Sequence, residues 1–99
     1  MATSERAFYT LDHDLRLVNA GPRAQALWGK SRRELVGRRM TDVFPAVDGS
    51  PMHQSLLEAL RTLRPTRLKT DSPIIGRAVE LEIYPVNGKL QVSVWTTPA

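Results

Sequence analysis

The sequence of 99 residues contains no cysteine. Disulfide bonds, thiolate zinc sites and cysteine nucleophiles are therefore all excluded, and the absence is in keeping with a reducing cytoplasm, where we expect the protein to work. The chain has no apolar run close to the roughly 20 residues that span a bilayer, and residues 1–6 lack the apolar core of a signal peptide. We therefore expect no insertion into a membrane.

Aromatic residues are scarce, at 6% of the chain. Lysine and arginine number 14 against 10 acidic residues, and much of the excess is spread over residues 32–39 and 61–69, with no aromatic residue among them. A nucleic-acid binder of this size usually concentrates basic residues on one element and adds aromatic rings that stack on bases. We therefore expect a solvated surface and no nucleic-acid partner.

The residue patterns that carry catalysis are also missing. The sequence has no Ser-His-Asp order, no paired carboxylates on a predicted rigid face, no glycine-rich phosphate loop and no cluster with metal-ligand spacing. Asp12, Asp14 and Asp42 are better explained as turn and cap residues. The sequence therefore predicts a protein that is not an enzyme.

The strongest structural signal lies between residues 77 and 96. Asn87-Gly88 is the pair most typical of a two-residue type I′ turn. With this turn, the cross-strand pairs on one face are all apolar and those on the other face are mostly polar, so a shift by one residue would mismatch them. The apolar pairs are Leu81 with Val94, Ile83 with Val92 and Pro85 with Leu90; the others are Glu80 with Trp95, Glu82 with Ser93 and Tyr84 with Gln91. The sequence predicts an antiparallel hairpin with one face to bury.

The rest of the chain predicts the elements that cover this face. Strands are expected at 7–11, 15–18 and 66–70, a short helix from Pro22 to Gly29, and a second one that begins at the capping box of Ser31 and Glu34. Residues 38–45 read as irregular. The longest helix runs from Pro51 to residue 63 or 64, with an apolar stripe of Met52, Leu56, Ala59, Leu60 and Leu63. We predict an α+β fold: a five-stranded antiparallel sheet with short helices and one longer helix packed on one face.

Several fragments in this order resemble a PAS domain. They are residues 8–12 (FYTLD), 17–20 (LVNA), 27–31 (LWGKS), 34–38 (ELVGR), 42–45 (DVFP) and 79–81 (VEL), followed by Pro85 before a glycine-containing turn. The resemblance runs from about residue 8 to 97, which implies one PAS-like domain over 1–99 with its core at about 7–97. One departure is the end of the last strand, Trp95-Thr96-Thr97, where members that relay a signal often have Asp-Ile-Thr.

The resemblance implies a sensory or dimerisation domain of a signal-transduction protein, such as a bacterial two-component histidine kinase or a cyclic-dinucleotide enzyme. In this family the buried sheet face lines a ligand cavity. A ligand bound there would shift the packing between the long helix and the sheet. The candidate lining residues are Tyr9, Leu11, Leu56, Leu60, Leu81, Ile83, Val92 and Val94. The hydroxyl of Tyr9 would orient a small-molecule ligand. The alternative is that these side chains simply fill the core.

Two cofactors stay open, although no cofactor is the leading expectation for the isolated domain. The lack of cysteine excludes a cysteine-dependent flavin photocycle and a cysteine-tethered chromophore, but leaves non-covalent flavin possible. Haem is the sharper alternative because His53, in the first turn of the long helix, resembles the proximal histidine of oxygen-sensing PAS domains. The competing explanation is a partly exposed surface histidine.

The outer face of the sheet is the candidate interaction surface. Aromatic side chains in a polar field are common interface anchors, and the candidates here are Phe8, Tyr84 and Trp95. We expect a homodimer or a contact with an adjacent signalling domain through this face. A ligand-free protein-interaction module is the further alternative.

Overall fold

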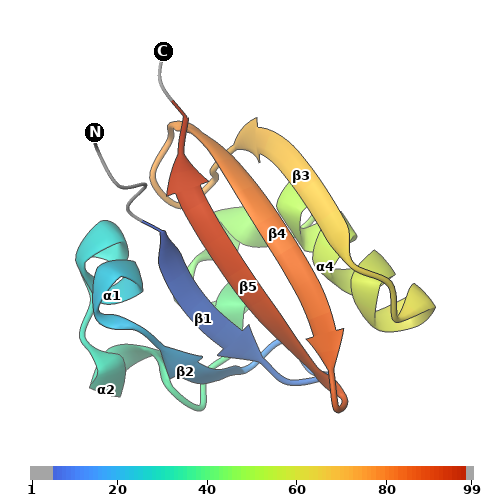
Figure 1. Cartoon of the computed structure of the whole chain (residues 1–99). Helices are drawn as coiled ribbons and strands as arrows, with labels where there is room; N and C mark the ends of the chain where they lie inside the picture. The colour runs from blue at the N-terminus through green and yellow to red at the C-terminus, as the bar shows by residue number, and fades with distance from the viewer. Residues whose placement is uncertain (1–5, 98–99) are drawn as a thin grey trace.

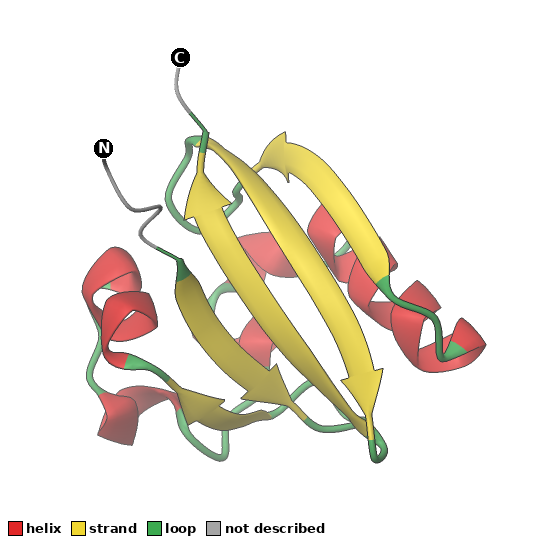
Figure 2. Cartoon of the chain, in the orientation of Figure 1, coloured by secondary structure: helices red, strands yellow, loops and turns green. Residues whose placement is uncertain are grey.

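A computed structural model describes residues 6–97 of the chain (Figure 1). An antiparallel sheet forms one layer and the helices gather on one of its faces (Figure 2). The elements, in chain order, are β1 (Ala7–Leu11), β2 (Leu17–Ala20), α1 (Pro22–Trp28), α2 (Arg32–Leu35), α3 (Met40–Val43), the 3-10 turn η1 (Pro45–Val47), α4 (Pro51–Thr62), β3 (Thr66–Asp71), β4 (Ala78–Val86) and β5 (Lys89–Thr96). The predicted α+β fold with a five-stranded antiparallel sheet is confirmed.

The strand order is β2-β1-β5-β4-β3, so the first and last strands of the chain meet in the middle of the sheet. Ala7 pairs with Val94, which brings the described beginning and end of the chain to the same end of the sheet (Figure 1). Within residues 6–97 no helix has both the length and the apolar character needed to cross a membrane.

The predicted register of the β4–β5 hairpin is confirmed. Leu81 pairs with Val94, and Ile83 pairs with Val92. Asn87 and Gly88 have φ angles of 51° and 76°, the two positive values that a type I′ turn requires. Turn chemistry and apolar pairing therefore fix the same alignment of the two strands.

The prediction of a second strand at 15–18 is wrong by two residues. The carboxylate of Asp12 accepts hydrogen bonds from the backbone N–H groups of Asp14 (2.9 Å) and Arg16 (3.0 Å), which extends the turn beyond residue 14. Leu15 adopts φ 61° in this turn, yet its side chain is buried. An apolar turn residue whose side chain is buried in the core has the same sequence signature as the first residue of a strand.

The segment 38–45 is more regular than predicted, since it contains α3 and runs into η1. Its beginning lies along β2: the N–H of Leu17 donates to the carbonyl of Arg38 (2.9 Å), and the N–H of Gly37 donates to the carbonyl of Leu17 (2.7 Å). The backbone around residues 37–38 thereby satisfies polar groups that an edge strand would otherwise present to solvent.

Helix α4 covers the inner face of the sheet through part of its predicted stripe. Met52, Leu56 and Ala59 are buried, and Leu60 is partly buried against the core. Leu63 is 67% exposed, contrary to prediction, because the helix ends before it and it forms a left-handed cap with φ 56°. The core therefore lies between the inner sheet face and the middle of α4.

Candidate functional site

The structure brings the eight predicted cavity-lining residues together on the inner side of the sheet. Leu60 is partly buried, and the other seven belong to one buried hydrophobic cluster: Tyr9, Leu11, Leu56, Leu81, Ile83, Val92 and Val94. Four of them, Leu11, Leu56, Leu81 and Ile83, have no exposed surface. Helix α4 covers the part of this cluster that lies on β4 and β5, whereas Tyr9 and Leu11 lie on β1, which packs against α1.

Tyr9 is the polar feature of this interior. Its ring packs edge-on against Trp28 at a centroid distance of 4.8 Å, and Trp28 packs in the same way against Phe44 at 5.2 Å. Burial raises the pKa of the Tyr9 hydroxyl, so the group remains a hydrogen-bond donor at all physiological pH values. This aromatic row was not predicted from the sequence.

The Tyr9 hydroxyl has no hydrogen bond to any of residues 6–97, while the residue as a whole is 3% exposed. In the same part of the chain, no fully buried side-chain oxygen or nitrogen lacks a partner. The hydroxyl therefore keeps a small accessible surface and is free to donate to an acceptor placed beside it.

His53 does not fit the role of a haem ligand. Its Nδ1 accepts a hydrogen bond from the N–H of Gly49 (2.9 Å) and lies 3.6 Å from a carboxylate oxygen of Asp48. A neutral imidazole that accepts at Nδ1 carries its proton on Nε2, which then has no lone pair for iron. A ligating histidine instead donates its second ring N–H to an oxygen acceptor. The His53 side chain therefore holds the loop that precedes α4 through its contacts with Gly49 and Asp48.

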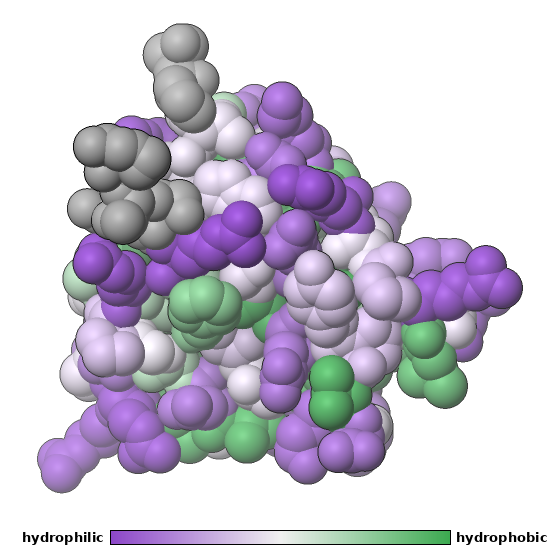
Figure 3. Space-filling model, viewed as in Figure 1, coloured by the Kyte–Doolittle hydropathy of each residue, from purple (hydrophilic) through white to green (hydrophobic). Residues whose placement is uncertain are grey.

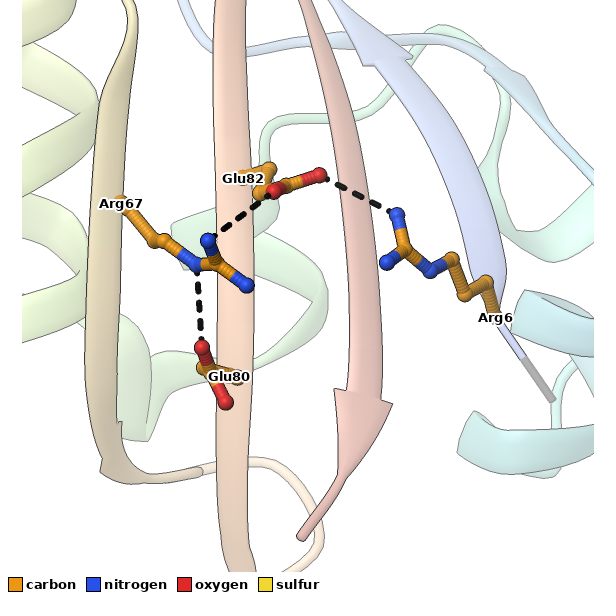
Figure 4. Close-up of polar contacts among 4 residues, drawn as sticks. All are labelled: Arg6, Arg67, Glu80 and Glu82. Carbon is orange, nitrogen blue, oxygen red and sulfur yellow. Dashed lines mark hydrogen bonds and ion pairs between the residues drawn. The ribbon is translucent and has the colours of Figure 1, made fainter. Parts of the chain in front are cut away.

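The outer face of the sheet carries a network of four charged residues (Figure 4). Arg6 lies 3.1 Å from Glu82, and Arg67 bridges Glu80 at 3.0 Å and Glu82 at 3.7 Å. The guanidinium of Arg6 also lies 4.2 Å from the ring centroid of Trp95, a cation–π distance. Trp95, predicted as an interface anchor, is therefore partly covered by the side chain of Arg6.

Phe8 and Tyr84, the other predicted anchors, stand free on this outer face. They are 58% and 43% exposed and line a hollow of about 400 Å³, together with Gln91 and Ser93. The space-filling view of this face shows hydrophobic side chains set singly among hydrophilic ones (Figure 3). The exposed aromatic surface is therefore Phe8 and Tyr84 rather than all three predicted residues.

A comparison with protein-family models assigns the chain to a family. The family model described as "PAS fold" matches residues 2–96. No curated protein matches the sequence.

Similar solved structures include a domain of an HTR-like protein from Haloarcula marismortui, with a TM-score of 0.79, 15% identity and coverage of 94% of this chain and 98% of that one. They also include the PAS domain of the RpfR quorum-sensing receptor from Cronobacter turicensis in complex with BDSF, with a TM-score of 0.77, 13% identity and 99% coverage of both chains. A third is the PAS domain of nitrogen regulation protein NR(II) from Vibrio parahaemolyticus, with a TM-score of 0.70, 19% identity and coverage of 93% and 89%. With its sheet order, its covering helix and this family match, the chain belongs to the PAS fold family, a family of sensory modules in signal transduction.

Proposed function

We propose that this PAS domain senses a small organic molecule bound between α4 and the inner face of the sheet. The observation that carries the proposal is the free, uncharged Tyr9 hydroxyl at the margin of an otherwise apolar interior. Apolar walls with one or a few directed polar groups are typical of small-molecule sites. The RpfR domain in complex with BDSF, which has the same fold, supports the proposal by analogy.

A small molecule bound in this interior would displace the part of α4 that carries Leu56 and Leu60. The strands opposite this helix expose their other side chains on the outer face, so a shift of β4 or β5 also moves Glu82 and Trp95. Binding would therefore change the contacts of Arg6, the first described residue of the chain. In this mechanism the sheet transmits the change in packing to neighbouring segments or domains.

Thermal-shift measurements with BDSF and a library of small organic compounds test this function. A ligand at about ten times its Kd stabilises by about 1.4 kcal/mol, which corresponds to a rise in Tm of about 6–11 °C for a domain of this size. We expect Leu60→Trp to abolish the rise, because the larger indole at this partly buried position would compete with a bound compound for room beneath α4. Leu57→Trp is the matched control, since Leu57 is 47% exposed on the same helix.

The proposal predicts that the control variant retains the ligand-induced rise in Tm. It is contradicted if no compound stabilises the wild-type domain. A rise that persists unchanged in Leu60→Trp would place the bound compound elsewhere.

Pairing with a second copy through the outer sheet face is the companion proposal. Exposed Phe8 and Tyr84 flank a hollow into which an aromatic ring of a partner fits. The two arginines and two glutamates of the neighbouring network cancel in charge, so two copies of this face meet without strong repulsion. The structure thus offers apolar anchors on a nearly neutral surface.

Sedimentation velocity tests this pairing with the double variant Phe8→Glu/Tyr84→Glu. We expect the Kd of the dimer to rise about 100-fold, because four carboxylates would enter an apolar contact. Leu63→Glu is the control, as it adds a charge at a 67% exposed leucine outside this face. A wild-type protein that stays monomeric at high concentration, or a double variant that still dimerises, would refute this pairing.

A further inference from the structure

The charge of the chain is divided unevenly along its length. Residues 16–39 contain seven of the 14 basic residues and only one of the 10 acidic ones, Glu34. The remainder of the chain therefore carries more acidic than basic residues. The positive net charge of the protein comes entirely from the segment that includes β2, α1 and α2.

Folding gathers most of these basic side chains at one end of the domain. Arg16 and Arg39 form an isolated backbone bridge, and Arg16, Lys30 and Arg38 line one hollow of about 460 Å³. Helix α2 begins two residues after Lys30 and adds two further exposed arginines. We call this region the basic surface, and it consists of Arg16, Lys30, Arg32, Arg33, Arg38 and Arg39. The sequence expectation of a scattered basic excess therefore does not hold in space.

Within the described residues, the cations of the basic surface form no direct ion pair with a carboxylate. Among residues 6–97, none of the six lies within ion-pair distance of an acidic side chain, whereas Arg6, Arg61 and Arg67 each do. The nearby carboxylate of Glu34 accepts a hydrogen bond from the N–H of Ser31 at 2.8 Å, in the capping box of α2. Backbone and side-chain hydrogen bonds with Ser31 lower the pKa of Glu34, and the positive charges of Lys30 and Arg38 lower it further, so the carboxylate is charged at neutral pH. Six cations gathered around two carboxylates, those of Glu34 and Asp42, leave a net positive surface that favours the arrival of an anionic partner.

We propose that the basic surface binds an acidic segment of a partner protein. Five of its six cations are arginines, whose planar guanidinium groups bind carboxylates through two parallel hydrogen bonds. The binding is independent of the small-molecule site, because the hollow lies beside β2 and α2 and shares no residue with the lining of the interior.

The lining of the hollow favours a protein over a nucleic acid or a lipid surface. Besides three cations, it contains Glu34, Asp42 and Val43, and it contains no aromatic ring. A continuous row of phosphates would meet both carboxylates and would find no ring on which bases stack. A peptide instead offers carboxylates to the arginines and N–H groups or lysines to Glu34 and Asp42.

Fluorescence anisotropy tests the proposal with a labelled peptide of alternating glutamate and serine residues. We expect binding at about 50 mM salt that weakens steeply at about 300 mM salt. Arg16→Glu/Arg38→Glu should weaken binding by at least about tenfold, because like charges then face the peptide. Lys30→Glu/Arg38→Glu serves as a second variant if the first loses its thermal unfolding transition.

The matched control is Arg64→Glu/Lys89→Glu, which changes the net charge equally at two exposed positions outside the basic surface. We expect this control to bind the peptide as the wild-type protein does. An equal loss of binding in the control would show an effect of net charge alone and overturn the proposal. Tighter binding of a single-stranded oligonucleotide, or of phosphatidylserine vesicles, than of the peptide would also overturn it.

Discussion

Leu56→Ala is expected to lower the free energy of unfolding by about 2–5 kcal/mol. Leu56 has no exposed surface and lies in the part of α4 that roofs the core, where the neighbouring side chains cannot all collapse into the space left by the substitution. For a domain of this size each kcal/mol corresponds to about 4–8 °C in Tm. Urea unfolding followed by far-UV circular dichroism would measure the loss.

Leu57→Ala provides the matched comparison, since it makes the same chemical change one residue further along the same helix. Leu57 is 47% exposed, so we expect a change within about 0.5 kcal/mol. Equal losses in the two variants would show that α4 does not use this face to cover the sheet. Such a result would remove the physical basis of the proposed interior site as well.

The hairpin formed by β4 and β5 shows what the sequence can predict. Its alignment follows from two local facts: Asn87-Gly88 adopts positive φ at low cost, and apolar residues alternate in both strands. The capping box of Ser31 and Glu34 was predictable for the same reason, because both partners lie within one turn of helix. Where a few neighbouring residues decide the structure, sequence reasoning succeeds.

The predictions fail where contacts between segments that are distant in sequence determine the structure. Leu15 is buried from a turn because residues 37–40 lie beside it, with the N–H of Met40 donating to its carbonyl. Trp95 is covered by Arg6, which is brought there by the pairing of β1 with β5. Neither contact has a periodic signal in the sequence.

The candidate site was predictable to a similar extent. Alternation along β1 placed Tyr9 and Leu11 on the buried face, as the structure confirms, but it gave no information on the ring of Trp28 beside Tyr9. The position of His53 in α4 was predicted, whereas the direction of its Nδ1 depends on the backbone of Gly49 in the preceding loop. The sequence thus identifies which residues face a site more readily than which atoms are available in it.

The two tryptophans of the chain provide the final prediction, because they lie on opposite faces of the sheet. Trp28 packs between Tyr9 and Phe44 and thereby holds α1 against β1, so Trp28→Ala should destabilise the domain by about 3 kcal/mol. Trp95→Ala removes the cation–π contact with Arg6 and should cost about 1 kcal/mol. Urea unfolding followed by far-UV circular dichroism compares both variants without relying on indole fluorescence. A larger loss of unfolding free energy for Trp95→Ala would mean that the charged outer face contributes more to the stability of the domain than the aromatic row does.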